Sequence, residues 1–324
     1  MLLRITWFIL ALIVFVPARA QEAQSIRVGL LRFGTVAWEI ETIRYHGLDR
    51  SHGIAVVPVE FASNEAAKVA VQAGAVDMIV TDWPWVARQR SEGEAFSFVP
   101  YSKAVGTLMI PADSSLRSLG DLLGKRIGVA GGPLDKSWLL LRAHAQKELG
   151  IDLAKEAEPV FGAPPLLNEE LARGRIDAVL TYWHYAARLE AGGAKPLLTV
   201  ADMIRRLGID HDVPMLGYAF REQWARNESV ALQGFVAASR EAKALLATSQ
   251  EEWARLAPQI GTDEPAVLAT LQAGFRAGTP EHWTPAERQA AADLYAILVR
   301  VGGDKLVGRA KVFDAKTFWP SVAY

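Results

Sequence analysis

Cysteine is absent from the 324 residues of the chain. Its absence excludes disulfide scaffolds, thiol nucleophiles, zinc sites with thiolate ligands and iron–sulfur clusters. An excess of one charge is missing as well, because 35 basic and 36 acidic residues leave a formal net charge of −1. The sequence therefore offers no strongly basic surface for nucleic acid and no polybasic run for a membrane.

Motifs for nucleotides and for hydrolysis are also missing. No Gly-x-Gly-x-x-Gly, Gly-x-Ser-x-Gly or His-Glu-x-x-His occurs, and residues 120–125 have the wrong spacing for a phosphate-binding loop. His211 lies between two aspartates, but three adjacent residues rarely converge on one ion, so we expect a solvated turn there. We therefore expect neither a metal nor a cofactor.

Residues 1–20 are predicted to form a cleavable signal peptide. Arg4 precedes a run at 5–16 that is apolar except for Thr6, and Ala18 and Ala20 form a small-residue cleavage site. The run is short for a membrane span, although an uncleaved anchor is the alternative. Since no cysteine follows the cleavage site, the sequence predicts export to the periplasm without lipidation.

The rest of the chain is long enough for two domains, at about 150 residues each. A fifteen-residue segment recurs at an offset of one hundred: residues 74–88 and 174–188 are identical at six positions, where ordinary composition predicts about one. The first copy contributes Gly74, Asp77, Thr81, Trp83, Ala87 and Arg88 to these identities. This spacing is too long for a solenoid and predicts two similarly built α/β lobes.

Both copies have the same order of predicted elements. Strands at 26–31 and 126–130 each lead through a glycine-bearing turn to a helix, at 36–46 and 136–149. A second strand and helix precede the third strand, at 77–80 or 177–180. Strands that alternate with helices predict parallel sheets, which bind ligands beyond the carboxyl ends of their strands.

The chain is expected to cross between the lobes twice, at apolar strands 105–110 and 213–220. Long amphipathic helices follow at 227–248 and 285–301. We therefore predict a discontinuous first lobe (residues 21–104 and 217–324) and a continuous second lobe (residues 105–216). The predicted fold is α/β, with two doubly wound lobes joined by a two-strand hinge that closes over a cleft.

Four segments resemble a known family of proteins: residues 28–39, 74–77, 118–129 and 174–178. Together they are similar to class II periplasmic solute-binding proteins of ABC importers, within the nitrate/sulfonate/taurine/thiamine-pyrimidine binding family. The resemblance covers nearly all of residues 25–320 and implies a non-enzymatic monomer. Such a protein encloses a small solute between its lobes and delivers it to an inner-membrane permease.

Aromatic side chains are the first candidates for the solute site. Flat rings at a cleft can enclose a planar or cationic ligand with little loss of entropy. We expect rings from both repeats at the strand ends, namely Trp83, Trp85, Tyr182 and Trp183. For Trp83 and Trp183 the cleft is favoured over the core, because each directly follows a strand. For Trp38 and Trp138, on the opening turns of helices, core and cleft are equally expected.

The glycine-bearing turns are the second candidates, since free N–H groups at a helix start can bind an anion. They contribute Phe33 and Thr35 in the first lobe and Gly132 and Asp135 in the second. Three acids near these turns would repel a pure anion and favour a cationic or hydrogen-bond-donating ligand: Glu39, Asp82 and Asp135. Asp82 and Asp135 are also suitable helix caps, the favoured role for Asp135. His184, beside Trp183, is a candidate to hydrogen-bond a ligand.

These residues favour a small planar or heteroaromatic solute, such as a pyrimidine related to thiamine. An organosulfonate, taurine or nitrate is the alternative solute. Enzymes on the same fold form a second class of function, but the pyrimidine synthases need a cysteine-containing motif that this chain lacks. A sensor partner with the same fold is a third possibility.

Overall fold

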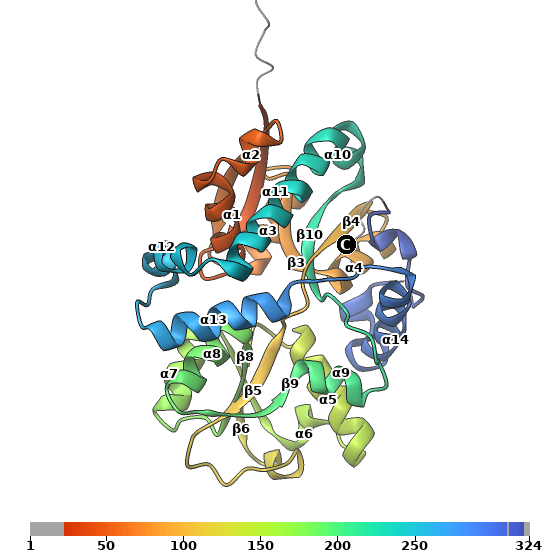
Figure 1. Cartoon of the computed structure of the whole chain (residues 1–324). Helices are drawn as coiled ribbons and strands as arrows, with labels where there is room; N and C mark the ends of the chain where they lie inside the picture. The colour runs from red at the N-terminus through yellow and green to blue at the C-terminus, as the bar shows by residue number, and fades with distance from the viewer. Residues whose placement is uncertain (1–22, 310, 321–324) are drawn as a thin grey trace, which may run out of the picture.

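The computed structural model of the chain describes residues 23–309 and 311–320, and it contains two five-stranded sheets (Figure 1). The predicted signal peptide at 1–20 lies outside the described residues. Within the described part of the chain, every helix is too short or too polar to cross a membrane. The class predicted from sequence, α/β with two sheets, is confirmed.

The first sheet has the strand order β2-β1-β3-β10-β4. Its strands are β1 (Gln24–Leu31), β2 (Ile54–Phe61), β3 (Met78–Asp82), β4 (Phe96–Ser102) and β10 (Leu216–Arg221). β1 pairs in parallel with β2 and β3, whereas β10 is antiparallel to both β3 and β4. The predicted parallel pairing is confirmed for β1, β2 and β3, but it does not extend to β10, which enters this sheet directly from the other lobe.

The second sheet repeats this arrangement in the order β7-β6-β8-β5-β9. Its strands are β5 (Gly106–Ile110), β6 (Arg126–Ala130), β7 (Glu158–Gly162), β8 (Ala178–Tyr182) and β9 (Lys195–Thr199). Here β5 is the antiparallel strand, and it too follows directly after the chain has crossed between lobes. The crossings are residues 103–105 and 207–215, and β5 and β10 each lie wholly within one sheet.

The sequence repeat corresponds to one structural device that is used in both sheets. The carboxylates of Asp77 and Asp177 accept the backbone N–H of Arg27 and Arg126, at 2.7 and 2.8 Å, at the start of the first strand of each copy. Gly74 and Gly174 adopt φ values of 71° and 66°, a region that favours glycine. The spacing that the two copies share therefore places the start of β3 beside β1 and the start of β8 beside β6.

The helices cover both sheets, and the last ones connect them. The first lobe contains α1 (Val36–Tyr45), α2 (Leu48–Ser51), α3 (Asn64–Gln72) and α4 (Trp83–Ser91), and the second contains α5 (Lys136–Leu149), α6 (Leu153–Glu156), α7 (Pro164–Ala172), α8 (Trp183–Ala191) and α9 (Val200–Arg206). The C-terminal part contains α10 (Glu222–Asn227), α11 (Ser229–Thr248), α12 (Gln250–Ile260), α13 (Pro265–Gly278) and α14 (Pro285–Val307). α13 packs on α11 and α8, and α14 packs on α4 and α5, so both span the two lobes (Figure 1).

Candidate functional site

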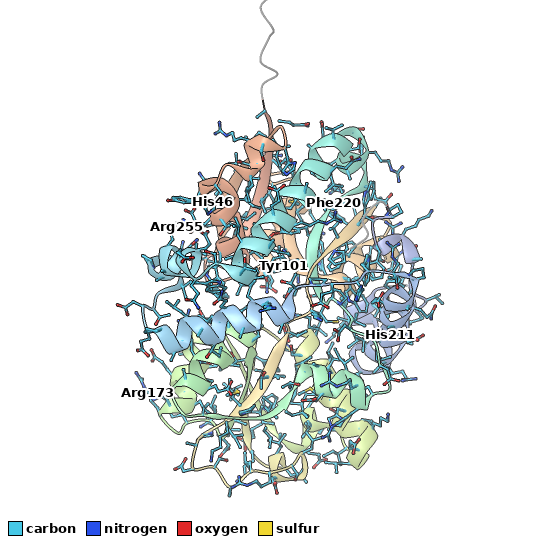
Figure 2. The ribbon with its side chains drawn as sticks, in the orientation of Figure 1. His46, Tyr101, Arg173, His211, Phe220 and Arg255 are labelled. Carbon is cyan, nitrogen blue, oxygen red and sulfur yellow. The ribbon has the colours of Figure 1, made fainter. Side chains whose placement is uncertain are left out.

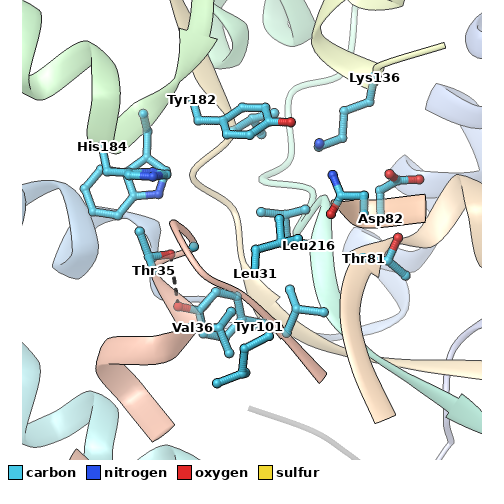
Figure 3. Close-up of a pocket in the computed structure, with 16 residues that line it drawn as sticks. Leu31, Thr35, Val36, Thr81, Asp82, Tyr101, Lys136, Tyr182, His184 and Leu216 are labelled. Atoms are coloured by element: carbon cyan, nitrogen blue, oxygen red, sulfur yellow. Dashed lines mark hydrogen bonds between the residues drawn. The ribbon is translucent and has the colours of Figure 1, made fainter. Parts of the chain in front are cut away.

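A cavity of about 90 Å³ lies between the two sheets, at the carboxyl ends of β1, β3 and β8 (Figure 3). Its polar and aromatic walls come from both lobes: Thr35, Asn64, Thr81, Asp82, Tyr101, Lys136, Tyr182, Trp183 and His184. This volume is smaller than the roughly 150 Å³ that suffices to hold benzene in an engineered cavity. In this closed arrangement the site therefore suits a compact solute, and a larger one requires the walls to separate.

Lys136 brings a positive charge into this cavity. It is the first residue of α5, it is 8% exposed, and its ammonium lies 5.9 Å from the centre of the Tyr182 ring. Its nearest carboxylate oxygen, on Asp135, is 3.8 Å away, beyond hydrogen-bond distance. Among the described residues Lys136 has no hydrogen-bond acceptor. The ammonium can therefore still donate hydrogen bonds to a ligand, while the Asp135 carboxylate partly balances its charge.

Lys136 was missed by the sequence analysis. A lysine at the first position of a helix opposes the helix dipole, which favours negative charge at that end. A lysine at this unfavourable position could have indicated a functional role in the sequence, because it does not stabilise the helix.

Asp82 contributes the opposite charge, from the first lobe. It caps α4 by accepting a hydrogen bond from the backbone N–H of Trp85 at 3.0 Å, and it also lines the cavity. The two roles considered for this residue are therefore compatible. Nearby, the hydroxyls of Thr35 and Tyr101 lie 3.3 Å apart on the same wall. The cavity thus presents one carboxylate on the first lobe and one ammonium on the second (Figure 3).

Tyr182 and His184 line the second lobe's side of the cavity. Burial raises the pKa of the Tyr182 phenol, and the negative charges of Asp135 and Asp82 raise it further, so the hydroxyl stays protonated. Burial lowers the pKa of His184 to about 3, against a smaller opposing effect of its hydrogen bond to Phe33. Its Nε2 lies 3.0 Å from the carbonyl oxygen of Phe33 in the first lobe. At neutral pH the imidazole is therefore uncharged.

Trp83 differs from expectation, because it lies in the core rather than at the cavity. It is fully buried and packs edge-on against Phe313 and Phe318, with ring centres 5.5 and 6.2 Å away. The chain after α14 returns to β4, where Phe318 forms a bridge with Phe98, and its Phe313 and Phe318 cover this indole. Trp183, at the equivalent repeat position, meets α13 instead and remains at the edge of the cavity.

Three further tryptophans lie away from the cavity walls. Trp138 is buried in the core of the second lobe, and Trp38 is buried behind the site, edge-on to Trp183 at 6.1 Å. Trp85 is half-buried against Phe96 at 5.3 Å. The structure therefore gathers fewer indoles at the solute site than the sequence predicts, because helix faces and not strand ends determine where these rings point.

Of the acids expected to repel an anion, Glu39 is engaged away from the cavity, whereas Asp135 lies beside Lys136 at its edge. Glu39 is fully buried and accepts hydrogen bonds from Lys243, from Tyr218 at 2.8 Å and from Ser239 at 2.5 Å. Asp135 caps α5 through the backbone N–H of Ser137 at 2.8 Å, and neither it nor Gly132 lines the cavity. The argument against an anionic solute therefore loses Glu39 but keeps the charges of Asp82 and Asp135.

The remaining histidines show no metal site. In the described part of the chain, no three His, Cys, Asp or Glu side chains are grouped so that they could hold a metal ion. The side chain of His211 is 57% exposed and lies 3.8 Å from Glu287 (its position is labelled in Figure 2).

Comparisons with known proteins agree with this architecture. Residues 45–252 match the family described as NMT1/THI5 like. No curated protein sequence matches the chain. The periplasmic aliphatic sulphonate binding protein SsuA from Escherichia coli is 20% identical, with a TM-score of 0.70 over 91% of this chain and 97% of that one. The periplasmic nitrate-binding protein NrtA from Synechocystis PCC 6803 is 11% identical, with a TM-score of 0.62 over 91% and 84%.

A third structure was solved with a ligand. The alkanesulfonate-binding protein SsuA from Xanthomonas axonopodis pv. citri, bound to MOPS, is 18% identical to this chain. It aligns with a TM-score of 0.69 over 92% of this chain and 99% of its own. At these identities the likeness establishes the shared fold.

Proposed function

The chain belongs to the NMT1/THI5-like family, and from this membership and the cavity we propose that it is the periplasmic solute-binding component of an ABC importer. Its two lobes close on one small solute, and the closed form delivers the solute to an inner-membrane permease. The observation that carries the proposal is a cavity walled by strand ends of both sheets, with the ammonium of Lys136 on one wall, 3.8 Å from the carboxylate of Asp135.

For the solute, the geometry favours a compact acidic molecule, such as an organosulfonate or nitrate. Lys136 supplies the positive charge, and the hydroxyls of Thr35 and Tyr182 lie on the same walls. The planar heteroaromatic solute is kept as second candidate. It is favoured by the Asp82 carboxylate, which can accept N–H groups, and by the ring of Trp183.

A binding role without catalysis is supported by the state of His184. Its Nε2 donates to a backbone carbonyl, and its Nδ1 has no serine or threonine hydroxyl within hydrogen-bond distance among the described residues. A nucleophile activated by this base would need such a contact. The signal peptide predicted at 1–20 supports export, and we propose that the exported protein acts as a monomer.

The experiment is native mass spectrometry of freshly purified protein, followed by calorimetric titration with methanesulfonate, nitrate and an aminopyrimidine. We expect binding of an acidic solute and its loss, by at least tenfold in affinity, in Lys136→Met. Lys147→Met, at the other end of the same helix, is the matched control and should bind normally. If the aminopyrimidine binds and the acids do not, the preference for an acidic solute is wrong. If nothing binds and no ligand co-purifies, the transport role itself fails.

A further inference from the structure

We propose that His184 is a latch between the two lobes, and that closing the cleft requires a neutral imidazole at this position. The hydrogen bond from His184 Nε2 to the carbonyl oxygen of Phe33, 3.0 Å long, joins the start of α8 in the second lobe to the turn before α1 in the first. The proposal rests on the hinge closure of the proposed function, but it does not depend on which solute is bound.

The hydrogen bond determines the tautomer of the ring. Because a carbonyl oxygen only accepts, Nε2 must carry the hydrogen, and Nδ1 is then an acceptor. Nδ1 is buried and has no hydrogen-bond partner among the described residues. Protonation would add an N–H and a positive charge at a place where no acceptor faces them. The closed arrangement therefore tolerates the neutral ring and disfavours the charged one.

The surroundings of the ring act in the same direction. From α1, the uncharged indole of Trp38 lies edge-on at 6.0 Å, and on its own helix Tyr185 lies 4.7 Å away. The positive charge of Arg188, one turn further along α8, opposes protonation. The other titratable groups of the cavity are two opposite charges and two phenols: Asp82, Lys136, Tyr101 and Tyr182.

Opening the cleft reverses this situation. Separation of the lobes removes Phe33 and Trp38 from the ring, so water can solvate it and its pKa returns towards the ordinary value of about 6.5. The closed form binds fewer protons than the open form, so acid favours opening. With a pKa of about 3 when closed, lowering the pH from 7.5 to 5 shifts the equilibrium towards the open form by about 30-fold.

The absence of cysteine allows a direct test, because two introduced cysteines can carry a fluorescent donor and acceptor. Ala66→Cys in α3 and Leu166→Cys in α7 are exposed, and they lie on equivalent helices of the two lobes. Transfer efficiency is measured on single molecules at pH 7.5 and pH 5, and circular dichroism verifies folding at both. We expect efficient transfer at pH 7.5 and a shift towards low transfer at pH 5.

Two variants separate the latch from general acid effects. In His184→Gln the amide N–H can still donate to Phe33 but does not titrate, so transfer should stay high at both pH values. His144→Gln is the matched control. His144 is also buried, but it lies within α5, and neither of its ring nitrogens has a hydrogen-bond partner among the described residues. It should respond to pH as the parent does. Should the glutamine variant at 184 misfold, ring nitrogen NMR of the parent still tests the proposal.

The NMR expectation is a neutral His184 with its hydrogen on Nε2 at pH 5.5 in the closed population. The proposal is overturned if the parent keeps one transfer efficiency at both pH values while folded, if His184→Gln opens with acid as the parent does, or if the ring is charged in the closed form. A failure of the proposed function shows instead as the absence of any bound solute in the mass spectrometry and the titrations, so the two failures are distinguishable.

Discussion

Replacement of Lys243 by methionine is expected to destabilise the first lobe strongly. Lys243 and Glu39 form an ion pair in which both side chains are at least 96% buried. The Lys243 ammonium also lies 4.2 Å from the centre of the Tyr101 ring, on the cavity wall. Burial lowers the pKa of Lys243, and the charge of Glu39 opposes this effect. Removing the lysine leaves a buried carboxylate without its cation.

The magnitude follows from what is known of buried pairs. Removal of one partner costs about 3–5 kcal/mol, because the other charge stays desolvated. A large domain loses about 2 °C in Tm per kcal/mol, so we expect a decrease of about 6–10 °C. The double variant Glu39→Gln/Lys243→Met removes both charges, and it should recover more than half of the loss.

The assay is urea unfolding of the parent, both single variants and the double variant. The control is Lys311→Met, which removes an exposed ion pair with Asp304 and should cost less than about 1 kcal/mol. Two results would refute the reasoning: a Lys243→Met loss no larger than that of Lys311→Met, or a double variant less stable than both single variants. In either case the buried charge of Glu39 would be tolerated without its cation.

Two further predictions concern the repeated tryptophans and acid stability. Trp83→Ala should cost about 3–5 kcal/mol of stability, whereas Trp183→Ala should mainly weaken solute binding, as paired urea unfolding and calorimetry will show. Burial alone would raise the pKa of Glu252. Hydrogen bonds from Arg255, Thr42 and His46 outweigh this effect and lower the pKa to about 2. This carboxylate therefore stabilises the fold above about pH 4.5, and the contribution is lost as the pH falls towards 2. Glu252→Gln should flatten that part of a Tm–pH profile.

The fold was predictable because its signals are local. Gly74 and Gly174 end helices, Asp77 and Asp177 bind backbone at fixed distances along the chain, and the alternation of strands and helices sets the sheet order. These interactions depend on residues within one copy of the repeat. The direction of β5 and β10 was not predictable in this way, because it depends on how the chain crosses between lobes.

The site was predictable only in part, because some of its residues are placed by local structure and others by contacts between distant segments. Asp82 and Tyr182 are the last residues of their strands and His184 comes two residues after one, so all three lie at the cavity because the strands end there. The position of Trp83 depends instead on a C-terminal segment more than two hundred residues away, which covers the indole. Contacts of that kind are set by tertiary packing, and the spacing of residues in a repeat carries no information about them.

The differences between the two copies explain the chemistry of the cavity better than the identities do. The identical residues at 74, 77, 174 and 177 support the backbone, whereas several of the positions that line the cavity differ between the copies. Val36 corresponds to Lys136 and Asp82 to Tyr182, and all four line it. Pro84 corresponds to His184, so only the second copy can reach across to the other lobe. A symmetric frame thereby acquires an ammonium and a donor on one wall and a carboxylate on the other, which gives a bound solute a defined orientation.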